Sequence, residues 1–295
     1  MATRLLWPQI NEGSTWQRLC RRCVRASLVS ALLGIAISGA GCTAGNSHAE
    51  EIVVTGSTTL LPIAEIAGEM FHEKNPVYKV LVSGLGSSAG IESVAKGSSD
   101  IGTSSRDLKD EEASLGLYDT PVAIDAIAVI VNPRNPVSSL TKAQVRSIFA
   151  GEITNWSEVG GEDRAIGLVN RDEASGTREA FLKIAMEKQP FDRRAAVLPG
   201  TGQVRSVVAQ APSAIGYISL GFVNDEVKAI AVDGVAPSIG TVIDGTYPIQ
   251  RTLHFFTVGE PIGLTKEYAD FVLSPQVQDT IVEDAGFIPI SRKAK

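Results

Sequence analysis

The chain has 295 residues, of which 44% are hydrophobic, and its formal net charge is −6. This length allows one large domain or two domains of ordinary size. The hydrophobic fraction is high enough to build extensive cores, which excludes an intrinsically disordered protein. The acidic balance argues against a nucleic-acid-binding protein, because such proteins carry basic surfaces.

Residues 1–49 have the order of an export signal. Four arginines between positions 18 and 25 precede an uncharged, mostly apolar run at 26–38, and small residues follow at 39–41. The apolar run is shorter than a comfortable transmembrane span. We therefore expect the folded body to begin near Glu50. Residues 50–295 keep 22 of the 27 basic residues and 32 of the 33 acidic residues, a net charge of −10.

Two processing routes fit this leader. The segment Gly39-Ala40-Gly41-Cys42 resembles a bacterial lipobox, in which Cys42 becomes the lipidated N-terminus. Alternatively, cleavage after Ala49, which ends an A-x-A-like segment, releases a protein without an anchor. All of the cysteines lie in the leader, so we expect the exported body to be held together by its core, without disulfides.

Strand and helix patterns alternate along the body. Apolar and alternating runs predict strands at 52–54, 78–82, 100–103, 123–132, 166–169, 214–218, 230–232 and 253–258. Helical spacing of apolar residues predicts helices at 60–74, around 91–95, and at 141–150, 178–188 and 267–273. This alternation predicts an α/β protein whose mostly parallel sheets are covered by helices.

Three of the expected strands run into loops of Gly, Ser and Thr that open helices: Gly56–Thr59, Gly84–Gly90 and Arg171–Thr177. The first amides of a helix are unpaired, and the helix dipole places partial positive charge there. Glycine allows close backbone approach, and hydroxyl groups add hydrogen-bond donors. Three such loops, one of which carries an arginine, can converge on a small oxyanion.

The segment 138–161, which reads SSLTKAQVRSIFAGEITNWSEVGG, together with these loops resembles the phosphate-binding receptors of bacterial phosphate ABC transporters (PstS-type). The resemblance runs through nearly all of Glu50–Arg292. It implies a two-lobed periplasmic-binding-protein fold of type II, with two α/β lobes joined by two hinge crossings around a buried ligand. We expect one lobe to comprise residues 50–128 and 246–295 and the other 129–245, with crossings near 126–132 and 245–251.

The resemblance also implies the ligand-binding residues. In this sequence they are Ser57, Thr58, Thr59, Leu60, Ser87, Ser88, Arg171, Ser175, Gly176 and Thr177. The planar guanidinium of Arg171 suits one edge of a phosphate. Glu173 stands where the family often has an acid that orients this arginine, so we expect it to contact Arg171.

The chain departs from the family pattern at Ser105. Many relatives carry an aspartate there, which accepts the proton of the bound phosphate and repels fully ionised sulfate. We hypothesise that Asp125, on the expected hinge strand, accepts this proton instead; the alternative is a structural aspartate that caps backbone amides. Arg106 either adds a second positive group to the site or is a solvated surface charge.

We expect an extracytoplasmic phosphate receptor that delivers its ligand to an ABC permease and its ATPase. A receptor for another tetrahedral oxyanion, such as sulfate or arsenate, and a surface or sensor protein without a transport role are the alternatives. We expect no enzymatic activity: a serine nucleophile needs a neighbouring base, and the body offers only His72 and His254. No metal, cofactor or nucleic acid is expected, nor any membrane contact beyond a lipid on Cys42, and we expect a monomer.

Overall fold

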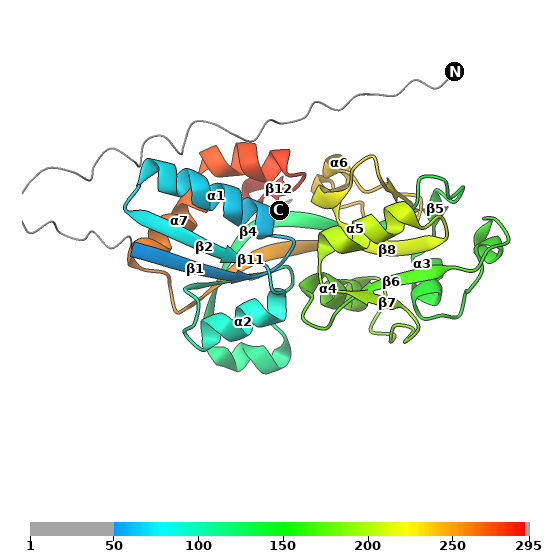
Figure 1. The fold of residues 1–295 in the computed structure, drawn as a ribbon, viewed down its shortest axis with the longest axis horizontal. Coiled ribbons are helices and arrows are strands. Elements are labelled where there is room, and N and C mark those ends of the chain that lie inside the picture. The colour runs from blue at the N-terminus through cyan, green and yellow to red at the C-terminus, as the bar shows by residue number, and fades with distance from the viewer. Residues whose placement is uncertain (1–49, 293–295) are drawn as a thin grey trace, which may run out of the picture. The chain divides into compact units, whose positions relative to one another are not determined.

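The computed structural model describes residues 50–292, which belong to one compact unit (Figure 1). The expected leader, including Cys42, lies outside the described residues. Within them, no helix is both long enough and apolar enough to cross a membrane. The described residues form an α/β structure whose strands and helices gather around separate hydrophobic cores, as predicted.

The first group of elements combines the N-terminal and C-terminal parts of the described chain. These elements are β1 (Glu50–Gly56), α1 (Leu61–Lys74), β2 (Tyr78–Ser83), α2 (Ser87–Ala95), β3 (Ile101–Ser104), a 3-10 turn (Asp110–Leu115), β4 (Leu117–Val131), β11 (Gln250–Val258), α7 (Gly263–Leu273), a π-helical segment (Val277–Val282), β12 (Ile288–Pro289) and a final 3-10 turn (Ile290–Arg292). β1 pairs in parallel with both β2 and β3, and β11 runs antiparallel to β3.

The second group comes from the middle of the chain. Its elements are β5 (Ser139–Leu140), α3 (Lys142–Phe149), a 3-10 turn (Trp156–Val159), β6 (Gly167–Arg171), α4 (Gly176–Ile184), β7 (Ala196–Leu198), α5 (Thr201–Gln210), β8 (Ala214–Ser219), a 3-10 turn (Leu220–Phe222), β9 (Lys228–Ala229), β10 (Ala231–Val232) and α6 (Ile239–Ile243). β6 pairs in parallel with β7 and β8, so this sheet is mostly parallel as well.

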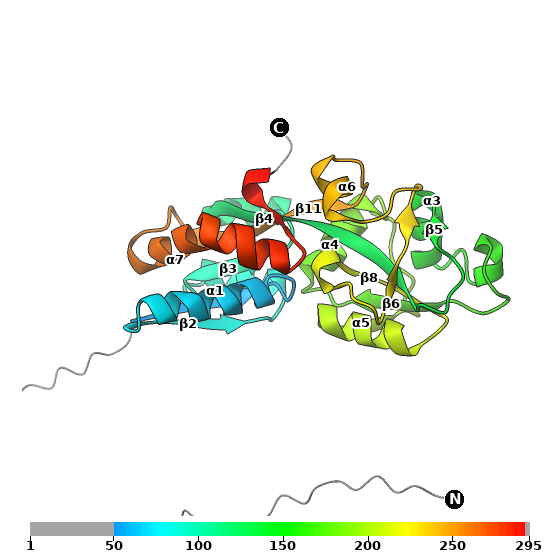
Figure 2. The same cartoon turned by 90° about the horizontal axis from the view of Figure 1, so that it is seen from above.

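One long strand connects the two groups. β4 pairs with β11 up to Ala126 and then with β8 from Ile127 onward, so it changes sheets in the middle (Figure 2). The hydrogen-bonded strand order is therefore continuous, β2-β1-β3-β11-β4-β8-β6-β7. We propose on this basis that residues 50–128 with 246–295 form the first lobe and residues 129–245 the second.

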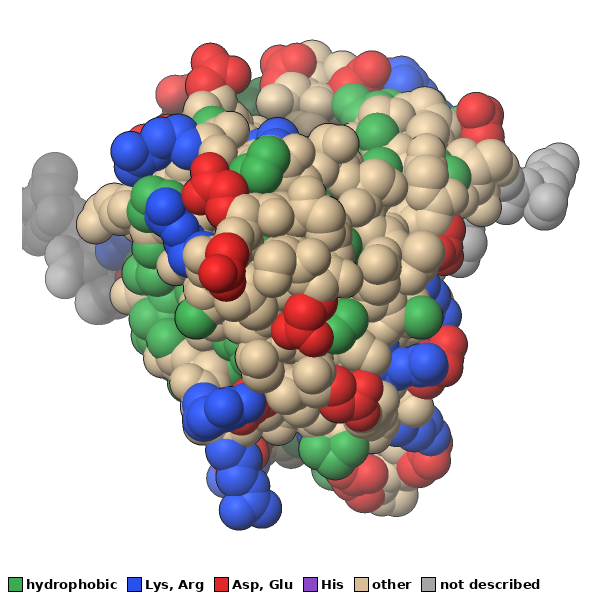
Figure 3. All heavy atoms as spheres, turned by 90° about the vertical axis from the view of Figure 1, so that its right-hand side faces the viewer, with side chains coloured by type: hydrophobic (Ala, Val, Ile, Leu, Met, Phe, Trp, Pro, Cys, Tyr) green, Lys and Arg blue, Asp and Glu red, His purple; other side chains and the backbone are tan. Residues whose placement is uncertain are grey.

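Each proposed lobe contains a hydrophobic cluster, and the second cluster also takes in Ile124 and Ile288 from the first-lobe ranges. In the first lobe, α1, β1 and α7 contribute to a cluster that includes Phe71 and Tyr268. In the second lobe, Phe181 stacks on Tyr217 with ring centroids 4.1 Å apart, in a cluster that also contains the buried Trp156. Figure 3 views the molecule from the second-lobe side and shows acidic and basic side chains interspersed, with no large patch of one sign.

Most predicted elements are present, and the differences have local causes. The helix predicted to reach residue 188 ends at Ile184, and it could not include Glu187 and Lys188, which adopt positive φ angles of 50° and 67°. The strand predicted from residue 123 starts earlier, at Leu117, because β11 supplies an antiparallel partner along its exposed first half. Helix α5, which begins at Thr201, was not predicted.

Candidate functional site

The first loop follows β1 and is closed by its own serine. The Ser57 hydroxyl accepts hydrogen bonds from the backbone N–H groups of Thr59 at 3.2 Å and Leu60 at 3.4 Å. This bonding takes the place of a side-chain cap on Leu60, the residue that precedes α1. Thr58 and Thr59 are thereby held at the end of the strand, with Thr59 buried and Thr58 half-buried.

The second loop brings two predicted serines together. Ser87 is the first residue of α2, and Ser105 comes directly after β3. The backbone N–H of Ser105 donates to the Ser87 hydroxyl at 3.0 Å, and the two hydroxyl oxygens lie 3.2 Å apart. Both residues are buried, whereas Ser88 is half-buried.

The third loop joins β6 to α4. Ser175 caps this helix, since its hydroxyl accepts a hydrogen bond from the backbone N–H of Arg178 at 3.2 Å. The first backbone bond of the helix runs from Glu179 to Ser175. The N–H groups of Gly176 and Thr177 therefore have no partner within the helix and are available as donors.

The three loops meet between the lobes. The Thr59 and Thr177 hydroxyl oxygens lie 3.2 Å apart, and the backbone N–H of Ser88 donates to the Ala174 carbonyl at 3.1 Å. Gly176 packs so closely against the first lobe that a Cβ atom there would lie 2.2 Å from the Ser87 hydroxyl and 2.8 Å from that of Ser105. The structure thus gathers the predicted loop residues into one cluster.

Arg171 lies inside this cluster without a carboxylate partner. It is 2% exposed, and its guanidinium donates to the carbonyls of Leu198 and Pro199 and to the hydroxyls of Thr201 and Thr58. Burial lowers the pKa of Arg171, and the nearby charge of Arg251 acts in the same direction, whereas that of Asp172 opposes the shift. A buried cation held only by neutral groups is suited to receive an anion.

The expected contact from Glu173 is wrong. Glu173 is exposed, and the hydrogen bonds of Arg171 go to the carbonyls and hydroxyls named above. The loop between β7 and α5 supplies those carbonyls and so orients the guanidinium in place of an acidic side chain.

Arg106 is neither a free positive group nor a solvated charge. It is 4% exposed and forms a two-pronged ion pair with Glu112, at 2.6 and 2.7 Å, while also donating to the Ser88 hydroxyl at 3.2 Å. Its charge is thus matched inside the first lobe. Gly86–Gly90 has the Gly-x-Ser-x-Gly spacing of a hydrolase nucleophile turn, but its central Ser88 contacts this arginine and no histidine.

Sequence reasoning missed Arg251, which lies on β11 directly opposite Asp125 on β4. The Arg251 guanidinium donates twice to one carboxylate oxygen of Asp125, at 2.9 and 2.7 Å. The other oxygen accepts from the Ser219 hydroxyl at 2.7 Å. Burial raises the pKa of Asp125 and lowers that of Arg251, and each charge opposes the shift of the other.

These contacts bear on the hypothesis that Asp125 accepts a ligand proton. A carboxylate offers about four lone-pair sites, and three hydrogen bonds, two from Arg251 and one from Ser219, already engage most of them. Asp125 therefore serves Arg251 and Ser219, which is closer to the structural alternative. The sequence signal for Arg251 was a single arginine just before the apolar run at 253–258, and the signal for Thr201 was a Gly-Thr pair before valines at helical spacing.

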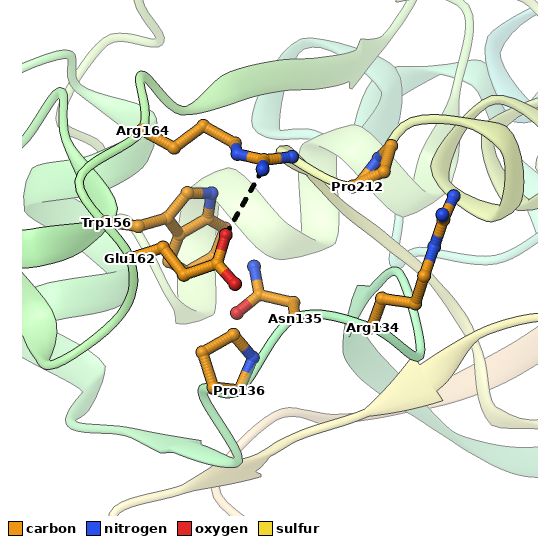
Figure 4. Close-up of a pocket in the computed structure, with 7 residues that line it drawn as sticks. All are labelled: Arg134, Asn135, Pro136, Trp156, Glu162, Arg164 and Pro212. Atoms are coloured by element: carbon orange, nitrogen blue, oxygen red, sulfur yellow. Dashed lines mark ion pairs between the residues drawn. The ribbon is translucent and has the colours of Figure 1, made fainter.

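Two cavities lie near or beyond this cluster. One of about 640 Å³ lies between the 106–111 segment and α4, and Arg251 forms part of its wall. A smaller one of about 150 Å³, lined by Trp156 and Arg164, lies in the second lobe and contains none of the predicted site residues (Figure 4). Within residues 50–292, no group of three or more His, Cys, Asp or Glu is arranged to hold a metal ion.

Comparison with known proteins places the chain in a family. The model of the PBP superfamily domain matches residues 41–276. The chain is 36% identical over 244 residues to the phosphate-binding protein PstS of Bacillus subtilis, covering 81% of each protein. It is 32% identical to PstS of Borreliella burgdorferi, covering 83% of this chain and 92% of that protein.

Solved structures agree with this assignment. A substrate-binding protein from Clostridium perfringens with bound phosphate is 38% identical and superimposes with a TM-score of 0.78, covering 82% of this chain and 100% of that one. An ABC-type phosphate transport receptor from Vibrio cholerae is 33% identical, with a TM-score of 0.69, covering 80% of this chain and 99% of that one. The chain belongs to the PBP superfamily and, within it, to the PstS family of phosphate-binding proteins.

Proposed function

We propose that this protein is an extracytoplasmic receptor that closes around inorganic phosphate and delivers it to an ABC permease and its ATPase. The observation that carries the proposal is Arg171, a buried cation that bonds only to neutral groups and is surrounded by hydroxyls from both lobes. Relatives whose names state phosphate binding, one of them solved with phosphate bound, support the same ligand.

The ligand-binding residues of this proposal come from both lobes. The first lobe contributes Ser57, Thr58, Thr59, Leu60, Ser87, Ser88 and Ser105, and the second contributes Arg171, Ser175, Gly176 and Thr177. We add Thr201, because its hydroxyl accepts from Arg171 and lies 3.1 Å from that of Thr58. Hydroxyls and helix N-terminal amides surround an anion with donors on several sides, which suits a tetrahedral ligand.

The proposed receptor acts without catalysis, as a monomer, and touches the membrane only through a lipid on Cys42. Mass spectrometry of the mature protein from the native host tests this last point. A lipid-modified N-terminal cysteine is the expected result, and a mature protein beginning at Glu50 contradicts it.

Calorimetric titration of residues 50–295 with phosphate, arsenate and sulfate tests the ligand. We expect one-to-one phosphate binding with a dissociation constant of about 1 μM or tighter. Absence of phosphate binding rejects the proposal. Sulfate binding in its place favours the other-oxyanion alternative, which Ser105 keeps open because no carboxylate stands at that position.

Replacing Gly176 with alanine tests the closed arrangement of the loops. The added methyl group would meet the Ser87 hydroxyl at 2.2 Å and the Ser87 Cβ at 2.8 Å, so the two lobes could not approach as closely. We expect phosphate affinity to fall by about tenfold or more, which corresponds to the usual ~1–3 kcal/mol of overpacking. The double variant Gly176→Ala with Ser87→Gly should recover part of the loss. Unchanged affinity in the single variant contradicts a site at this contact.

A further inference from the structure

Arg251 contacts the hinge and both lobes at once. Besides its two bonds to Asp125, its guanidinium donates to the Ser105 carbonyl at 3.1 Å, to the Thr177 hydroxyl at 2.9 Å and to the Thr59 hydroxyl at 3.3 Å. These bonds account for all five N–H groups of the guanidinium. Arg251 is therefore fully bonded, and its influence on a ligand must pass through the groups that it contacts.

The contacts with Thr59 and Thr177 fix what these hydroxyls can do. A guanidinium N–H can only donate, so both threonine oxygens act as acceptors toward Arg251. Their own protons must then point elsewhere. One proton can be shared between the two oxygens, which lie 3.2 Å apart, and the other is left to donate to a third group. Arg251 thus turns a pair of hydroxyls that span the two lobes into a donor.

Arg171 donates hydrogen bonds to a second pair of hydroxyls that spans the two lobes. It donates to Thr201 at 3.1 Å and to Thr58 at 3.3 Å, and these two oxygens lie 3.1 Å apart across the lobes. Each arginine therefore serves one threonine from the first lobe and one from the second. The adjacent residues Thr58 and Thr59 belong to the two different pairs.

Three serine hydroxyls of the site also act as acceptors toward the protein. The hydroxyls of Ser57, Ser87 and Ser175 each accept a hydrogen bond from a backbone N–H group. Part of the acceptor capacity of each oxygen is therefore used within the protein, and its proton can be donated to a ligand. Asp125 already accepts three hydrogen bonds, two from Arg251 and one from Ser219, so its carboxylate has little capacity left to receive a proton from a ligand.

We propose that Arg251, held by Asp125, is a specificity-determining positioning residue that orients the Thr59 and Thr177 hydroxyl pair to donate one proton to the ligand, so that the site prefers the less protonated, doubly charged form of phosphate over the singly charged form. The inference rests on the proposed function and names the ionic form of its ligand. The singly charged form of phosphate carries two protonated oxygens and the doubly charged form carries one, so the singly charged form brings one more proton that meets a donor in place of an acceptor. A fully ionised oxyanion such as sulfate meets no such penalty.

The test is the pH profile of binding. For the wild-type protein, we expect phosphate affinity to rise by about tenfold from pH ~5.5 to pH ~8.5, because the doubly charged form becomes dominant over this range. Sulfate should bind with an affinity that does not change over the same range. A phosphate affinity that is independent of pH, or rejection of sulfate, overturns the proposal, because either result requires an acceptor for the ligand proton.

The variant Arg251→Met tests whether Arg251 orients the threonine hydroxyls or has only a structural role. Without the guanidinium, the Thr59 and Thr177 hydroxyls can rotate and accept, so we expect weaker binding and a flatter pH profile. A variant that keeps the wild-type profile overturns the proposal. Arg146→Met, which removes an exposed arginine on α3 that pairs with Glu187, is the control and should keep both the affinity and the profile.

A second variant serves as a control for effects on folding. Arg251→Met alone leaves the buried Asp125 unpaired, so the double variant Asp125→Leu with Arg251→Met removes both charges together. Its pH profile should be equally flat, and a wild-type profile in this variant also overturns the proposal. Failure of the wild-type protein to bind phosphate at any pH rejects the proposed function. Phosphate binding without the pH profile rejects only the role of Arg251.

Discussion

Arg171→Met is expected to weaken phosphate binding by about 30-fold to several thousandfold, or ~2–5 kcal/mol, the usual effect of removing one partner of a desolvated charge pair. Arg171 is the buried cation of the site whose hydrogen bonds go only to neutral groups, so a bound anion is the charge that it can pair with. The side chain also donates to Thr58 and Thr201, which lose their orientation in the variant.

The same change should affect the ligand-free protein much less. Burial lowers the pKa of Arg171, which means that the fold disfavours its charge when no anion is bound. Thermal unfolding with and without phosphate measures both effects. Phosphate at about a thousand times its dissociation constant should stabilise the wild-type protein by ~4 kcal/mol, and the variant far less.

Arg205→Met is the matched control, because Arg205 is a half-buried arginine on α5 that bonds to Glu226 and to the Phe222 carbonyl and to none of the proposed ligand-binding residues. Its phosphate affinity should equal that of the wild-type protein. Wild-type affinity in Arg171→Met contradicts a site centred on this residue, whatever the stability of the variant.

The loops of the site could be predicted because their chemistry is local. Each of them couples the end of a strand to the start of a helix within a few residues, and Gly, Ser and Thr mark that transition in the sequence. Ser57 and Ser175 cap their own loops, so their position depends on neighbours in the chain. The family resemblance then indicated that the three loops meet, which residue spacing alone does not establish.

The groups that could not be predicted are the ones set by tertiary pairing. Arg251 and Asp125 are far apart in the sequence and meet only because β4 and β11 are antiparallel neighbours in this register. Arg171 is oriented by carbonyls of the loop before α5, where the sequence suggested Glu173. Backbone carbonyls are present at every residue, so a sequence gives no sign of which ones accept from a given arginine.

Asp125→Ala is expected to destabilise the protein by ~3–5 kcal/mol, because it leaves the buried charge of Arg251 without its counter-ion. Asp125 is fully buried and joins the hinge strand to β11 through Arg251 and to β8 through Ser219. Urea unfolding of the ligand-free protein measures the free energy of unfolding. Asp270→Ala, which removes an exposed partner of Lys266 on α7, should have a much smaller effect.

The double variant Asp125→Leu with Arg251→Met distinguishes the cost of an unpaired charge from the worth of the pair. Replacing a whole buried ion pair by apolar groups of similar volume is often neutral or even stabilising. We therefore expect the double variant to recover most of the stability lost in Asp125→Ala while still binding phosphate more weakly than the wild-type protein. Such a result would mean that the pair is retained to direct the Thr59 and Thr177 hydroxyls. If the double variant is as unstable as Asp125→Ala, the pair holds the hinge together, and its effect on the ligand is secondary.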